Sequence, residues 1–374
     1  MAAKHLKKWI WQRNDWPTFT WDEAALSSPL AAARRAQGEI TGFARLLDPS
    51  ADLAAQLDVL TTEGVATSAI EGETFEPDAV RSSLARRLGL PAVDLPAAPR
   101  SVEGLAEVLL DATQRYREPL TLQQINSWQA ALFPTGRSGL HEIRVGALRS
   151  VAPMRIISGP IGRELVHYEA PPGDRLGDEM VRFLTWFNAP PHGLDGLLRA
   201  GLAHAWFELI HPFEDGNGRV GRALMDRALA QDEGRSIRLY SLSARFMEVH
   251  DAYYAALEGA SRGTLDVTNW LRWFLEQFLA ASHASEKIVA HVVLKTRFWV
   301  KHSQSTLNTR QRKALNAMLD AGPQEFIGGM TNRKYAHLTK ASPATAQRDL
   351  AALVELGCLV PTDAGRSARY ELAI

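Results

Sequence analysis

Cysteine is almost absent from this sequence. The 374 residues include one cysteine, Cys358, which excludes a disulfide within the chain and a zinc site built on several cysteines. A chain with so little cysteine is typical of a reducing compartment, so we expect a cytoplasmic protein. No run of about 18 apolar residues occurs, and the N-terminus lacks the apolar core of a signal peptide, so we expect no association with a membrane.

Net charge is also lacking. The 42 Lys and Arg residues are balanced by 42 Asp and Glu residues, so no overall field attracts the molecule to a polyanion, and any such attraction must be regional. The length indicates two or three domains, and a hydrophobic content of 46% is enough for a sizeable core. From the changes in pattern along the chain we expect segments at 1–100, 101–300 and 301–374.

The pattern of apolar residues is mostly helical. Spacings of three and four residues recur through 31–70, 101–133 and 177–300, which predicts a mainly α fold. Residues 151–172 differ, because two β-prone runs flank a Gly-Pro turn and predict a β-hairpin. Four of the ten tryptophans lie within residues 1–21, among basic residues. They could stack on nucleic-acid bases, but we favour packing against the body of the protein.

The region that best predicts chemistry follows a helix expected to end at His211. Pro212 disfavours helical geometry in the residue before it and lacks a backbone donor, so the helix should stop there. The turn at 214–218 contains two glycines and an asparagine, which tolerate positive φ and can direct backbone N–H groups inward. A second helix is expected to start near Arg219. A glycine-rich turn that leads into a helix N-terminus is a favourable anion site.

Two arginines make this anion site more specific. Arg219 and Arg222 are three residues apart on the first helical turn, where the helix dipole disfavours a cation by about 0.3–1 kcal/mol. Their presence therefore predicts a polyanionic ligand. Asp215 could hold a Mg²⁺ ion that bridges phosphates, and the imidazole of His211 can take a proton from a hydroxyl near neutral pH. Together these groups favour nucleotide transfer without a P-loop, since no P-loop motif occurs.

An alternative for the same helix is a zinc site. His204, Glu208 and His211 are spaced at i, i+4 and i+7, so they share one helical face. We favour the simpler interpretation that His204 and Glu208 pack or form hydrogen bonds beneath the turn.

Residues 211–222, HPFEDGNGRVGR, match the signature HPFx[DE]GNGRxxR at every specified position, and the chain thus resembles Fic-domain proteins. The resemblance implies a helical Fic core that transfers AMP from ATP to a Ser, Thr or Tyr hydroxyl of a protein. It implies that His211 is the base and that Asp215 binds Mg²⁺. The phosphates of ATP are then bound by the following residues: Gly216, Asn217 and Gly218 (α and β), Arg219 (β) and Arg222 (γ).

Further similarities extend this resemblance. Thr67 through Gly72 fit the motif [ST]xxxE[GN] of autoinhibited Fic proteins, which implies that Glu71 pairs with Arg222 and blocks the γ-phosphate site. The hairpin resembles the flap that docks a target segment by strand addition, and its docking residues would be Leu165, Val166, His167 and Tyr168. Tyr253 and Tyr254 resemble tyrosines near the adenine pocket. Self-modification and a homodimer are further expectations, and removal of AMP from a modified protein is an alternative activity.

The last seventy residues have a different organisation. Three helical patterns precede two short β-prone runs, and Ser342 and Pro343 suit the start of the third helix. Residues 345–360 resemble a winged helix-turn-helix, which implies that Thr345, Gln347 and Arg348 face DNA. From Lys301 to the end, ten basic residues outnumber six acidic ones, a net charge of +4. A DNA-binding regulator is therefore an alternative function, and a protein-docking or dimerisation role is the other interpretation of this segment.

Overall fold

The computed structural model describes residues 9–45, 47, 49–90, 96–158, 163, 165–236, 238–321, 329–362 and 368–373. It is mainly helical, as the sequence predicts. The chain divides into two compact units, Met1–Glu286 and Lys287–Ile374. The division falls within the long helix α11 (Thr268–Lys301). Among these described ranges, no helix combines the length and the apolar character needed to cross a bilayer.

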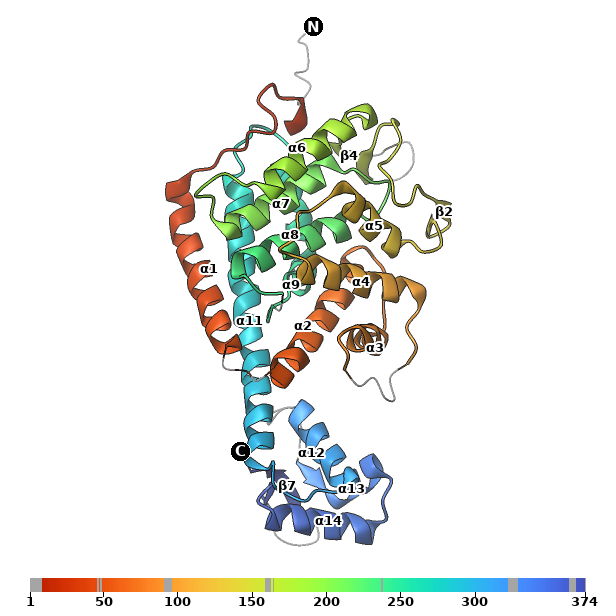
Figure 1. The fold of residues 1–374 in the computed structure, drawn as a ribbon, viewed down its shortest axis with the longest axis vertical. Helices are drawn as coiled ribbons and strands as arrows, with labels where there is room; N and C mark the ends of the chain where they lie inside the picture. The colour runs from red at the N-terminus through yellow and green to blue at the C-terminus, as the bar shows by residue number, and fades with distance from the viewer. Residues whose placement is uncertain are drawn as a thin grey trace. The chain divides into compact units, whose positions relative to one another are not determined.

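The first unit is a set of helices around a central pair, α7 and α8 (Figure 1). In α7 every residue except Gly196 and Glu208 is buried, as expected for a helix that is apolar on all sides. Its described elements before α11 are η1 (Ile10–Gln12), α1 (Glu23–Ala44), α2 (Pro49–Ile70), α3 (Pro77–Arg87), α4 (Arg100–Gln114), α5 (Leu122–Leu132), β1 (Arg137–Ser138), β2 (His141–Glu142), β3 (Arg155–Ser158), β4 (Leu165–Glu169), η2 (Gly173–Arg175), α6 (Leu176–Asn188), α7 (Gly196–Ile210), α8 (Asn217–Glu233), α9 (Leu242–Glu248) and α10 (His250–Ala260).

The predicted hairpin is present as the antiparallel pair β3–β4. Ile156 pairs with Tyr168, and the register shifts after Ile156, which marks a bulge. Two of the four N-terminal tryptophans, Trp9 and Trp11, pack against this region, as favoured above. The Trp11 indole donates to the carbonyl oxygen of Glu169 at 2.6 Å, and the Trp9 ring meets Tyr168 edge-on at 5.5 Å. This N-terminal segment therefore supports strand β4.

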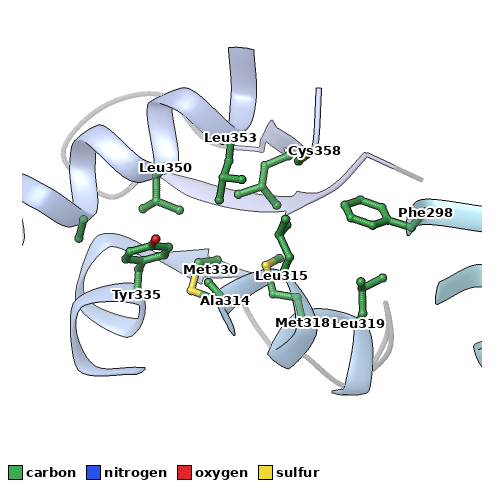
Figure 2. Packing of buried hydrophobic residues seen from close by; sticks show 12 residues of the cluster. Phe298, Ala314, Leu315, Met318, Leu319, Met330, Tyr335, Leu350, Leu353 and Cys358 are labelled. Carbon is green, nitrogen blue, oxygen red and sulfur yellow. The ribbon is translucent and has the colours of Figure 1, made fainter. Parts of the chain in front are cut away.

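The second unit is built around one apolar cluster. Its elements after α11 are α12 (Thr309–Ala321), β5 (Met330–Thr331), α13 (Asn332–Thr339), α14 (Pro343–Glu355), β6 (Leu359–Pro361) and β7 (Arg369–Leu372). The strands form a sheet in the order β5-β7-β6. Leu350 and Leu353 of α14 lie across the cluster from Leu315 of α12, with Tyr335 of α13 beside them (Figure 2).

The start of α14 is as the sequence predicts. The Ser342 hydroxyl caps the helix by accepting from the Thr345 N–H at 3.2 Å, and Pro343 takes the first helical position. The turn expected between the last two strands, at 363–367, lies outside the described residues.

Candidate active site

The loop between α7 and α8 is held rigidly by its own side chains. The helix ends at Ile210, and His211 takes a left-handed conformation with φ 49°. Phe213 is fully buried, as expected of an anchor. The Asn217 amide accepts from the backbone N–H of Phe213 and donates to its carbonyl oxygen, both at 2.9 Å. α8 begins at Asn217, two residues earlier than predicted, because Gly216 with φ 87° already completes the turn.

His211 is held in one orientation and kept neutral. Its carbonyl oxygen accepts from Nε of the buried Arg149 at 2.8 Å, and its ring Nδ1 lies 3.3 Å from the carbonyl oxygen of Glu208. Because a carbonyl can only accept, Nδ1 carries the proton and Nε2 is left as the basic nitrogen. Burial lowers the pKa of His211 to about 4. A neutral imidazole at pH 7 is thus ready to accept a proton. Nothing in the sequence around Arg149 indicated this contact.

A second group of titratable residues lies beneath the loop. His204 Nε2 is 2.8 Å from the Tyr253 hydroxyl, and the two rings stack with centroids 5.9 Å apart. Burial lowers the pKa of His204 to about 3 and raises the pKa of Glu208 to about 8. His204 is thus a packed, neutral residue. In the part of the chain that the structure describes, no three His, Cys, Asp or Glu side chains gather as metal ligands would.

The N-terminus of α8 is an anion site that a carboxylate of the chain already fills. The N–H groups of residues 217–219 have no acceptor within their own helix, and the dipole is positive there. A Cβ atom on Gly218 would lie 2.1 Å from Glu71 Oε1, so the carboxylate rests directly against the backbone. The same oxygen accepts from Nη2 of Arg222 at 2.8 Å. The structure therefore brings together Glu71, the α8 N-terminus and Arg222.

Arg222 is buried, with 1% of its side chain exposed. Its Nε donates to the Thr67 hydroxyl at 2.7 Å, and its Nη2 donates to the Thr67 carbonyl oxygen at 2.8 Å. Among the described residues, Nη1 of Arg222 is a buried donor with no acceptor. The guanidinium is thus fixed by α2 and keeps one donor for a ligand.

The end of α2 explains how Glu71 reaches this position. The helix finishes at Ile70, and Gly72 has φ 76°. The Gly72 N–H donates to the Ala69 carbonyl oxygen and the Glu73 N–H donates to that of Ser68, both at 3.0 Å. These bonds are those of a Schellman cap, in which the left-handed position suits glycine or asparagine. The choice of Gly or Asn after the motif glutamate therefore has a conformational cause.

A second ion pair was missed by sequence reasoning. Arg219 Nη1 donates to Glu73 Oε2 at 2.8 Å, and the guanidinium lies over the Phe133 ring at 4.9 Å. Glu73 comes two residues after the motif glutamate, and 146 residues separate it from Arg219. Its sequence position alone carried no signal of this pairing.

Asp215 is oriented by its neighbours. Its Oδ1 accepts from the Gly216 N–H at 2.5 Å, and its Oδ2 accepts from the Ser138 hydroxyl. Its carbonyl oxygen accepts from the Gln129 amide at 3.3 Å. The carboxylate is therefore fixed at the start of α8.

Glu71, His211, Asp215 and Arg222 line one cavity of about 550 Å³. The cavity is lined by most of the site residues that the sequence predicted. These are Glu71, His167, Tyr168, His211, Asp215, Gly216, Asn217, Gly218, Arg222, Tyr253 and Tyr254. Arg219, Leu165 and Val166 are not in the lining. Leu165 is 60% exposed, whereas Tyr168 is buried and donates to the Leu209 carbonyl oxygen at 2.5 Å. Thr345, Gln347 and Arg348 belong to the second unit.

Comparison with known proteins identifies two regions of the chain. Residues 119–229 match the model of the Fic/DOC family, so the chain contains a Fic domain. Residues 9–90 match a domain of unknown function, DUF4172.

Curated relatives match over part of their length. A protein adenylyltransferase Fic of Culex quinquefasciatus is 36% identical over 166 residues, which are 43% of this chain and 30% of that protein. A uridine 5′-monophosphate transferase of Xanthomonas campestris pv. campestris is 32% identical over 117 residues, 30% of this chain and 21% of that protein. The chain thus covers less than a third of the length of either relative.

A solved structure shares the fold over nearly the whole chain. The crystal structure of a Fic family protein from Desulfovibrio desulfuricans aligns with a TM-score of 0.55 and 20% identity, over 95% of this chain and 98% of that one.

The Schellman cap at Gly72 leads to a prediction about stability. Gly72→Ala places a Cβ on a left-handed residue and should lower the free energy of unfolding by about 1–2 kcal/mol. Gly72→Asn should lower the free energy of unfolding by less, because asparagine tolerates this conformation. As a matched control, Gly42→Ala changes a helical glycine with open space around it and should be neutral or stabilising by up to about 1 kcal/mol. Urea denaturation measures all three, and equal effects of the two alanine variants would contradict the assignment.

The lowered pKa of His211 leads to a prediction about pH. In the unfolded chain an imidazole titrates near its ordinary value of 6.5, whereas the folded value is about 4. As the pH falls from 6.5 to 4 the unfolded state therefore gains a proton that the folded state does not, and stability is lost. His211→Ala should remove this loss, worth up to about 3 kcal/mol. Denaturation at pH 7, 5.5 and 4.5 tests it, and a ring titration by NMR with a midpoint near 6.5 would refute it.

Proposed function

On the premise that residues 119–229 form a Fic domain, we propose that this protein transfers AMP from ATP to a Ser, Thr or Tyr hydroxyl of a protein. One observation carries the proposal. The neutral imidazole of His211 and the anion site made by the α8 N-terminus and Arg222 line the same cavity. A base and a polyphosphate site that share one cavity suit nucleotidyl transfer to a hydroxyl.

The proposed reaction is a single displacement at the α-phosphorus. Nε2 of His211 takes the proton of the target hydroxyl while the oxygen of that hydroxyl bonds to the α-phosphorus. The bond from that phosphorus to the oxygen bridging the β-phosphate breaks, and pyrophosphate leaves. The N–H groups of Gly218 and its neighbours, with the two arginines, would neutralise the phosphate oxygens as charge moves toward pyrophosphate.

A Mg²⁺ ion would be held by Asp215 together with the phosphates. The donor set fits this ion, because Mg²⁺ in nucleotide sites is commonly bound by one or two carboxylates plus phosphate oxygens and water. The two hydrogen bonds received by Asp215 orient the carboxylate and leave lone pairs for a cation. When bound, the ion would offset phosphate charge.

We further propose that Glu71 restrains the enzyme. Its carboxylate occupies the position at Gly218 and Arg222 where an anionic phosphate would bind. A carboxylate and a phosphate satisfy the same guanidinium fork, so the two exclude each other. Activation therefore requires that the end of α2 moves or that Glu71 is replaced.

The target would dock at the hairpin beside the cavity. β3 and β4 form a two-stranded sheet in the described part of the chain, and Ile157 and Leu165 are 53% and 60% exposed. A strand added to this hairpin would bring its hydroxyl toward His211. Tyr254, 42% exposed in the cavity lining, would contact the nucleobase. A second copy of the chain is one candidate target, in a homodimer or a transient encounter.

The second unit supports DNA binding as a second candidate function. Lys287–Ile374 carries thirteen Lys and Arg against six Asp and Glu, a net charge of +7. Its order of helices and strands would suit a winged helix, in which α14 would be the recognition helix. On this helix Gln347 and Arg348 are exposed and Thr345 is half-buried. These are groups that contact bases and phosphates.

We expect self-labelling to separate the roles of Glu71 and His211. With labelled ATP and Mg²⁺, the unaltered protein should label itself slowly. Glu71→Gly should label at least about tenfold faster, because the competing carboxylate is gone. His211→Ala should not label, because no base remains at that position. Mass spectrometry of the product made with ATP, UTP or GTP identifies the transferred group.

Equal labelling of all three proteins would contradict the transferase assignment. If the protein instead removes AMP from a modified target, Glu71→Gly should lose that activity on a pre-labelled protein, since Glu71 would align the attacking water. If the protein prefers UTP, the proposed mechanism still holds, but the transferred group is UMP and not AMP.

DNA binding is tested on the full chain by retardation of duplex DNA. We expect affinity that falls steeply with salt, with a Kd of about 10⁻⁶ M or weaker for unselected sequence at physiological salt. Arg348→Ala should weaken binding. If the side chain contacts a phosphate, the slope of log K against the logarithm of the salt concentration should also fall in magnitude by about one. Glu355→Ala, at the other end of the same helix, should not weaken binding. No retardation at low salt would exclude the function.

A further inference from the structure

The two arginines at the start of α8 are each paired with a carboxylate from the same short segment. Oε1 of Glu71 lies 2.8 Å from Nη2 of Arg222, and Oε2 of Glu73 lies 2.8 Å from Nη1 of Arg219. Both guanidiniums are buried, with 1% and 3% of their side chains exposed. An anionic partner offsets the charge of a buried guanidinium, and here the segment 71–73 supplies a carboxylate to each of the two.

The cap of α2 produces this double contact. In the Schellman cap Gly72 is the left-handed residue, so Glu71 precedes it and Glu73 follows it. The turn allows both carboxylates to reach the same helix N-terminus. One backbone feature thus places two negative charges on a site whose two arginines and N–H groups suit two phosphates.

We infer that Glu73 is a second inhibitory carboxylate, which occupies the phosphate position at Arg219 while Glu71 occupies that at Arg222. The inference rests on the proposed function and extends it from one carboxylate to two. The segment 71–73 then acts as an internal substitute for the polyphosphate of the nucleotide. Full access for ATP requires release of both pairs.

The two pairs differ in strength. The side chain of Glu73 is 40% exposed, whereas that of Glu71 is 26% exposed, so water screens the Glu73 contact more. Glu71 therefore provides the main block and Glu73 a weaker one. Removal of Glu73 should release the site partly, and removal of both should release it fully.

The test measures nucleotide binding directly. Isothermal titration with AMP, ADP and ATP is made on proteins that carry His211→Ala, which prevents turnover. If Arg219 serves the β-phosphate, Glu73→Gln should tighten ADP and ATP about three- to tenfold and leave AMP unchanged. Glu71→Gly should tighten ATP by a larger factor. Glu76→Gln is the matched control, because it removes the same charge from an exposed residue that forms no cap hydrogen bond. It should change nothing.

The outcomes separate the inference from the function on which it rests. Unchanged ADP and ATP binding in Glu73→Gln, with tighter ATP binding in Glu71→Gly, would refute the role of Glu73 alone. Equal tightening of AMP, ADP and ATP would also refute it, since this indicates general loosening. No nucleotide binding by any variant would overturn the proposed function itself. Glu73→Ala, compared by circular dichroism and the same titrations, gives the result if the glutamine variant fails to fold.

Discussion

The positive charge at the N-terminus of α8 is the constraint on which the rest of the site depends. Unpaired N–H groups, the helix dipole and two buried arginines meet within one turn. Such a concentration of charge is unfavourable unless an anion neutralises it. In this structure the neutralising groups are Glu71 and Glu73 of the chain itself. Under the proposed function, a nucleotide phosphate would compete with these two carboxylates for the same positive charge.

The region 9–90, which matches a domain of unknown function, contacts the Fic domain at two places that matter for the chemistry. Its tryptophans support strand β4 through the Trp11 indole and the Trp9 ring. Its helix α2 ends in the segment 71–73, which holds the arginines of α8. Glu63 of α2 also accepts from the Ser241 hydroxyl at the start of α9, at 2.7 Å. One region thus braces the hairpin and fills the anion site.

Much of the site followed from local chemistry. Pro212 indicated where α7 ends, the glycines at 216 and 218 indicated an anion-binding turn, and each of these features depends on only a few neighbouring residues. The fold class followed in the same way from helical periodicity. α8 starts at Asn217, two residues before the start expected near Arg219, because Gly216 in the left-handed conformation already completes the turn.

Long-range contacts could not be predicted in this way. The pairing of Glu73 with Arg219 joins residues 146 positions apart, and the Arg149 contact that fixes His211 joins residues 62 apart. Nor could the pKa of His211 or Glu208 be known, since burial by distant helices sets both. The residue types and their spacing thus established which chemistry is available at the turn. Only the packing of α2 against α8 decided that Glu71 and Glu73 of the chain itself occupy the anion site. Residues so far apart in the sequence become neighbours only when the core folds.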